Sequence, residues 1–243
     1  MTQTKLQLGA TLRDMGASFE ANRPLFVRVT FLFAVFSAVS AVLEVNGTAG
    51  LAIWVGLTIL LGAAYVGMVT TLLCVPGKSQ DLGDLWATTK PVLARLIWVA
   101  VVGTLAVVVG MFALIIPGLI IATIWSVASQ AVVVEGRSVF ESLGRSRELV
   151  RNNGLRAFGY LVIVGILGLV MIGLALLVSA PLGDGLAGNI VGNFLTDMLS
   201  TPIFALGTAV LYNALIDIER SSQPGVEAEK DPYAGVTAPE PKD

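Results

Sequence analysis

The side chains that usually carry acid–base or metal chemistry are scarce in this sequence. Its 243 residues include no histidine and one cysteine, Cys74, at the end of a hydrophobic run. Histidine is the commonest general base and the commonest metal ligand, and a lone cysteine cannot form a zinc cluster. We therefore expect no catalytic residue, no metal site and no cofactor, and we predict that the protein is not an enzyme.

One glycine pattern is similar to a nucleotide-binding fingerprint. Residues 183–188 match GxGxxG, which binds a dinucleotide when it follows a strand and opens a helix. Here the match lies between two hydrophobic segments, so we interpret it as loop composition.

Polar side chains inside hydrophobic segments are a second place to look for a site. Three such residues are Gln130, Asn213 and Tyr65. They could line a polar path in a small transporter or channel, or they could form hydrogen bonds between helices, worth about 0.6–2 kcal/mol each. We favour packing, because an ion-coupled carrier usually has a charge near the middle of a span and Asp197 is expected near an outer boundary.

Basic side chains gather in one polar segment. Residues 135–156 hold five basic and three acidic residues, and Ser138 followed by Glu141 is a capping box that predicts a helix over 138–153. Its apolar residues share one side, so we expect it to lie flat on a membrane, where arginines near an anionic leaflet contribute about 1 kcal/mol each. The residues that we expect to contact lipid headgroups or a protein partner are Arg145, Ser146, Arg147, Arg151 and Arg156.

The rest of the chain is too apolar for a soluble domain. Hydrophobic residues make up 55% and charged residues 13%, against about 25% charged in soluble domains. Residues 96–134 carry no charge and would span about 58 Å as one helix, so this run must fold back, and Pro117-Gly118 is its turn signal. Because a span needs about 20 apolar residues, we predict six transmembrane helices, at about 24–43, 49–73, 93–116, 118–134, 155–179 and 194–216.

The positions of the fifteen lysines and arginines predict how these spans are oriented. Four lie within residues 5–28, three within 78–95, five within 137–156 and three within 220–242. Because basic residues near spans stay on the cytoplasmic side, we expect both termini in the cytoplasm and the protein in a prokaryotic plasma membrane. Arg28 interrupts the first apolar run, which favours an uncleaved span over a signal peptide. The formal charge of −2 gives no bias toward nucleic acid.

The predicted fold is an all-α membrane domain over residues 1–217, with its six helices arranged as three hairpins. Each hairpin follows an amphipathic stretch expected on the cytoplasmic side, at 8–22, 82–93 and 138–153. Residues 218–243 turn to a polar, proline-containing composition that cannot bury enough apolar area to fold, so we expect a disordered cytoplasmic tail.

A resemblance to a known family rests on the segment PGLIIATIWSVASQAVVVEGRSVFESLGRSRELVRNN. It resembles the glycerophosphoryl diester phosphodiesterase membrane-domain family and related six-helix proteins in a helix that opens with Pro-Gly, ends in a valine run and Glu-Gly, and is followed by Arg-Ser and Leu. The resemblance implies a six-helix membrane module, sometimes fused to a soluble phosphodiesterase. Without histidine, these residues do not supply the acid–base pair of such an enzyme. The matching positions, besides Arg145-Ser146, are Pro117, Gly118, Glu135, Gly136 and Leu149.

These features predict a non-enzymatic integral membrane protein that interacts with membrane lipids or serves as a scaffold for a partner at the cytoplasmic face. The alternative is a small transporter or channel with a polar path lined by the fourth and sixth helices. A continuous polar cavity between those two helices would favour the alternative.

Overall fold

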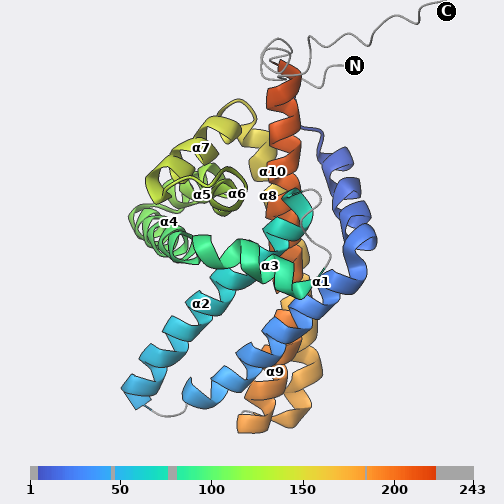
Figure 1. Cartoon of the computed structure of the whole chain (residues 1–243). Helices are drawn as coiled ribbons and strands as arrows, with labels where there is room; N and C mark the ends of the chain where they lie inside the picture. The colour runs from blue at the N-terminus through green and yellow to red at the C-terminus, as the bar shows by residue number, and fades with distance from the viewer. Residues whose placement is uncertain (1–4, 45–46, 76–80, 184, 223–243) are drawn as a thin grey trace, which may run out of the picture.

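The computed structural model describes residues 5–44, 47–75, 81–183 and 185–222, and every regular element in these ranges is a helix. Short 3-10 turns at Lys90–Val92 and Ala180–Leu182 join some of them. The α-helices, labelled in Figure 1, are α1 (Leu8–Glu44), α2 (Gly47–Cys74), α3 (Leu82–Thr89), α4 (Leu93–Ala113), α5 (Ile115–Ile124), α6 (Ala128–Glu135), α7 (Val139–Arg151), α8 (Gly154–Ser179), α9 (Leu186–Leu199) and α10 (Thr201–Ser222).

The expected number of membrane spans is confirmed. Within the described ranges, six helical segments are long and apolar enough to cross a bilayer. They are Leu8–Val39, Ile53–Cys74, Leu82–Ala113, Ile115–Glu135, Gly154–Leu182 and Leu186–Ser222.

The first amphipathic stretch and the first span form one helix. The sequence predicts separate elements at 8–22 and 24–43, whereas α1 runs through both and contains Pro24. Figure 1 shows α1 descending beside α10 and then bending toward the far end of α2. Proline removes a helical hydrogen bond and kinks a helix without always ending it, so Pro24 accounts for the bend.

The turn of the α4–α5 hairpin lies at Leu114, three residues before the predicted Pro117-Gly118 turn. Leu114 is extended, with φ −165° and ψ 141°. Pro117 lies in the first turn of α5, where its missing N–H has no partner to lose. Gly118 serves close packing instead, because a Cβ there would lie 2.4 Å from Met111 Cγ. The boundaries predicted at 93–116 and 118–134 shift accordingly.

Two predicted single spans are each broken into two helices. The fourth consists of α5 and α6, separated at residues 125–127, and the sixth consists of α9 and α10, which meet at Ser200. Pro202 lies at the start of α10, and a proline ring clashes with the helical backbone that precedes it, which explains the second break. Helix α10 ends at Ser222, four residues beyond the predicted start of the tail at 218, and residues 223–243 lie outside the described ranges.

Helix α10 lies at the centre of the molecule. The hairpin formed by α4 and α5 projects away from the other helices. Ala209 and Leu211 of α10 are fully buried, with 0% of their surface exposed. In Figure 1, α8, α9 and α10 run lengthwise while α4 and α5 are seen almost end-on, so the α4–α5 hairpin crosses the other spans at a steep angle. Its tip is highly exposed, with Phe112 at 89% and Ile115 at 71%. Helices α5 and α8 therefore diverge from the place where both meet α7.

Candidate functional site

Helix α7 is held in place by local signals at its start. Gly136 ends α6 with φ +65°, a conformation that glycine adopts without steric cost. The Ser138 N–H donates a hydrogen bond to Glu141 Oε2 at 2.9 Å and completes the expected capping box. This backbone N–H and the Ser138 side chain lower the pKa of Glu141 below its ordinary value. The start of α7 is therefore defined by the residues around it.

The inner face of α7 carries an ion-pair cluster centred on Arg145. Its Nη1 donates to Glu219 Oε1 at 2.7 Å, and its Nη2 donates to the other carboxylate oxygen. Its Nε donates to Glu135 Oε1 at 3.0 Å, and Tyr212 donates its hydroxyl to the same oxygen at 2.9 Å. Arg137 also pairs with Glu135. We call these five residues the Arg145 cluster.

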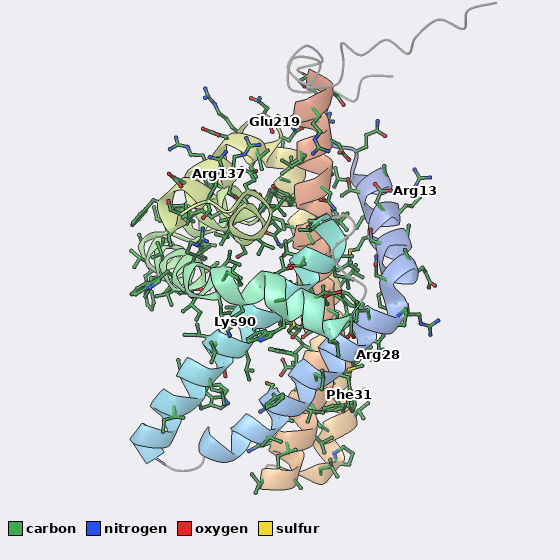
Figure 2. The ribbon with its side chains drawn as sticks, viewed as in Figure 1. Arg13, Arg28, Phe31, Lys90, Arg137 and Glu219 are labelled. Atoms are coloured by element: carbon green, nitrogen blue, oxygen red, sulfur yellow. The ribbon has the colours of Figure 1, made fainter. Side chains whose placement is uncertain are left out.

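The Arg145 cluster ties together α6, α7 and α10. Only 13% of the Arg145 side chain is exposed, and its hydrogen bond to Glu219 raises the pKa of the guanidinium above its ordinary value. Figure 2 shows Arg137 and Glu219 at the same end of the molecule, on the link before α7 and on α10. A two-pronged arginine–carboxylate contact is strong and directional. The expected contact of Arg145 with headgroups is therefore replaced by an internal one.

Ser146 is also internal. None of its surface is exposed, with a value of 0%. Its hydroxyl donates to the Ile124 carbonyl at 2.7 Å and accepts from the Val127 N–H at 3.3 Å. These two backbone groups flank the break between α5 and α6, so Ser146 supplies the partners that a continuous helix would have supplied. The expectation that Ser146 meets lipid headgroups is wrong for this reason.

Two further arginines make internal contacts at this end of the molecule. Arg156 Nη1 donates to the Leu6 carbonyl at 3.0 Å, and Asn153 Oδ1 accepts from the Leu6 N–H at 3.0 Å. Arg95 of α4 donates to the carbonyls of Gly136 and Arg137. Arg156 therefore holds the N-terminal segment, although its side chain is exposed.

The outer face of α7 presents the remaining two arginines of the predicted set. Arg147 and Arg151 are exposed and, within the described part of the chain, form no hydrogen bond or ion pair. Both line a cavity of about 590 Å³ between α5, α7 and the start of α8, which we call the α7 groove. Its other lining residues are Ile116, Leu119, Ile120, Thr123, Ile124, Val150, Gly154, Leu155 and Phe158. Sites for small molecules have volumes of about 300–1,000 Å³ and are mainly apolar with a few polar groups.

The three intramembrane polar residues do not converge on one site. Gln130 is 1% exposed and donates from Nε2 to Thr208 Oγ1 at 2.9 Å. Tyr65 shares a hydrogen bond of 3.0 Å with Thr30, and Asn213 donates to the Leu73 carbonyl at 3.1 Å. Each links a different pair of helices, namely α6 with α10, α2 with α1, and α10 with α2.

Two further polar groups lie within the apolar helical segments. Asp197 lies about 16 Å along α9 from its first residue, at roughly 1.5 Å per residue, in the segment Leu186–Ser222. Its Oδ1 accepts a hydrogen bond of 3.2 Å from Thr201. The Oε1 atom of Gln130 is buried and has no partner among the described residues.

The residues of the family-like motif lie at the joints of the α4–α7 region. Pro117 and Gly118 shape the start of α5, and Glu135 and Gly136 end α6. Leu149 is 7% exposed and packs in the core shared by α6, α7, α8 and α10. Glu219 and Tyr212 could not be predicted as members of the cluster, because nothing near them in the sequence indicates a partner 74 or 77 residues away.

Comparison with known proteins identifies the family. Residues 85–216, more than half of the chain, match the model described as a domain of unknown function, DUF7847. The chain belongs to this family. The DUF7847 match contains the whole α7 groove and all of the Arg145 cluster except Glu219.

One curated relative is itself a membrane protein. The UPF0259 membrane protein PC1_1998 of Pectobacterium carotovorum subsp. carotovorum (strain PC1) is 28% identical over 170 residues, which cover 69% of this chain and 66% of the relative. No solved structure matches. With six apolar helical segments and this relative, the DUF7847 chain is a multi-pass membrane protein. Neither match links it to the glycerophosphoryl diester phosphodiesterase membrane-domain family that the sequence resembles.

Proposed function

We propose that this DUF7847 protein is a non-enzymatic membrane module that binds anionic lipid headgroups through the outer face of α7. The observation that carries the proposal is the pair Arg147 and Arg151, which are exposed and unpaired within the described part of the chain. Arginine suits this role because its planar guanidinium matches the geometry of a phosphate. In contrast, Arg95, Arg145 and Arg156 are engaged within the protein.

The proposal places α7 at the cytoplasmic surface of a prokaryotic plasma membrane. All fifteen basic residues lie in the segments that the six-span arrangement puts on one side, which supports cytoplasmic termini. Phe140 of α7 is 77% exposed and would enter the interface beside the arginines. Three hairpins, each with an amphipathic cytoplasmic stretch at its start, form part of the same proposal. A protein partner docking on α7 would use the same surface.

The test compares lipid selectivity of matched variants in nanodiscs that contain phosphatidylglycerol and phosphatidylcholine. R147Q/R151Q should lose about 2 kcal/mol of preference for phosphatidylglycerol, or roughly 30-fold, at about 1 kcal/mol per arginine. R13Q/R28Q is the control, because it removes the same charge from α1, where both residues are exposed; Figure 2 labels both on this helix. Equal selectivity of R147Q/R151Q and wild type would sink the proposal.

A small transporter or channel is the second candidate function. It is favoured by Asp197, a carboxylate inside the sixth span, and by the unpartnered Oε1 of Gln130 in the fourth. Ionisable and polar groups within membrane spans often mark ion or proton pathways. Proton flux into proteoliposomes that falls in Asp197→Asn would support it, whereas equal flux with wild type, Asp197→Asn and empty vesicles would exclude proton conduction.

A further inference from the structure

We infer that the α7 groove is a binding site for one anionic glycerophospholipid, with its phosphate between Arg147 and Arg151 and an acyl chain along the wall formed by α5 and α8. This inference rests on the proposed headgroup binding by α7. It goes further, because it replaces a general attraction to a charged leaflet with a defined site, a defined ligand class and one molecule per chain.

The two arginines are placed to share one phosphate. They are four residues apart on α7, so their side chains emerge from the same face, one turn apart. Among the described residues, no aspartate or glutamate lines the groove. The neighbouring carboxylate of α7, Glu148, does not line the groove and lies 3.8 Å from Arg145. The groove therefore offers positive charge without an internal counter-ion.

The wall beside the arginines is apolar and uncovered. Ile116 and Ile120 of α5 are 71% and 52% exposed, and Leu155 at the start of α8 is 85% exposed. Within a bilayer these side chains face lipid tails that are as apolar as they are, so an acyl chain can pack along this wall by van der Waals contact. A small soluble anion would use the arginines and leave this wall bare.

The position of the groove favours a ligand that already resides in the membrane. Its walls belong to the fourth and fifth spans, which contain α5 and α8. Figure 1 shows α5 nearly end-on and α8 lengthwise, so the two helices cross at a steep angle. A phospholipid can therefore enter sideways, with its headgroup at α7 and its chain between the spans.

The composition of the groove also predicts headgroup selectivity. In the part of the chain that the structure describes, both charged residues that line it are arginines, and no carboxylate there can pair with an amine. Phosphatidylglycerol, which has a net negative charge, should bind more tightly than zwitterionic phosphatidylethanolamine, whose ammonium group would lie near two guanidiniums.

Gly154 allows the groove to be filled without removing an arginine. It lines the groove at the first turn of α8, and a Cβ added there would meet no atom within 4 Å. Gly154→Phe should therefore place a ring in the path of the acyl chain. Gly173→Phe is the matched control, because Gly173 is an exposed residue of the same helix, lies outside the groove and is equally open.

The experiment is native mass spectrometry of the purified full chain with equal amounts of phosphatidylglycerol and phosphatidylethanolamine. Wild type and Gly173→Phe should each retain one phosphatidylglycerol after the other lipids have dissociated. R147Q/R151Q should bind it roughly 30-fold more weakly. Gly154→Phe should lose the retained lipid while keeping the nanodisc selectivity of wild type. Circular dichroism checks folding, and Gly154→Leu replaces the phenylalanine variant if its helicity falls.

The outcomes separate the groove from the broader function. Wild-type retention by Gly154→Phe, together with loss in R147Q/R151Q, overturns the groove and leaves headgroup binding in place. Wild-type retention by both variants overturns both proposals. Displacement of the lipid by inorganic phosphate alone would show that the arginines recognise a free anion, and a chain dimer that retains no lipid would assign the groove to a second copy. Either result overturns the inference.

Discussion

The two faces of α7 use the same residue type in opposite ways. Arg145 on the inner face is 13% exposed and pairs with carboxylates of α6 and α10. Arg147, two residues later, is exposed and unpaired within the described ranges. Each residue of a helix is rotated by about 100° from the one before it, so residues two apart point to nearly opposite sides. Neighbours in the sequence therefore meet different surroundings. One helix can therefore carry an arginine in an internal ion pair on one side and exposed arginines without a described partner on the other.

Replacing Arg145 should have the largest effect on the stability of the protein. Arg145→Gln leaves Glu135 and Glu219 close together without the guanidinium between them. Partial exposure of these carboxylates screens the repulsion, so we expect a loss of about 2 kcal/mol, between the effects of surface and buried pairs. Unfolding in SDS, with Arg147→Gln as the control, measures this loss. If both variants have the same stability, the two faces do not differ as the structure indicates.

Replacing Arg147 and Arg151 should weaken lipid binding and leave the stability of the protein almost unchanged. R147Q/R151Q should weaken retention of phosphatidylglycerol roughly 30-fold and change the stability of lipid-free protein by about 0.5 kcal/mol or less, as expected for exposed residues without partners. Thermal unfolding in detergent before and after lipid addition measures both quantities. Lipid should raise the melting temperature of wild type but not of R147Q/R151Q. A large loss of stability without lipid would contradict the separation of the faces.

Ser146 tests whether the inner face also supports the broken fourth span. Ser146→Ala leaves the Ile124 carbonyl and the Val127 N–H without the serine oxygen, at a cost of about 1–2 kcal/mol. Ser222→Ala is the control, because that hydroxyl bonds only to the carbonyl one turn before it. Hydrogen exchange at residues 125–128 should become faster in Ser146→Ala alone. Unchanged protection there would remove Ser146 from this role.

The cap of α7 should have the smallest effect and should depend on pH. Ser138→Ala removes an N-cap worth about 1 kcal/mol. In wild type, the contribution of Glu141 is complete above its unfolded pKa and is lost as the pH falls through its lowered pKa in the folded protein. In Glu141→Gln this dependence should disappear, as measured by the melting temperature across the acidic range. If the melting temperature of wild type and of Glu141→Gln depended on acidic pH in the same way, Glu141 would not make this contribution.

Much of the fold could be predicted because it depends on local properties. The hydrophobic segments gave six candidate spans, and Ser138 with Glu141 gave the start of α7. The breaks were harder to place. Pro117 signals a turn but lies inside α5, because the first turn of a helix accepts proline. The break between α5 and α6 has no proline or glycine, and Ser146 of another helix satisfies its backbone groups.

For the site, the sequence by itself determined that basic residues collect in 135–156 and that a capped helix carries most of them. Only the tertiary structure decided which of these arginines are free. Arg145 is engaged by Glu219, 74 residues away, and Arg156 by the Leu6 carbonyl, 150 residues away, while Arg147 and Arg151 face the α7 groove. Charge and helical capping are properties of short segments, but a partner is set by which distant helices meet in space.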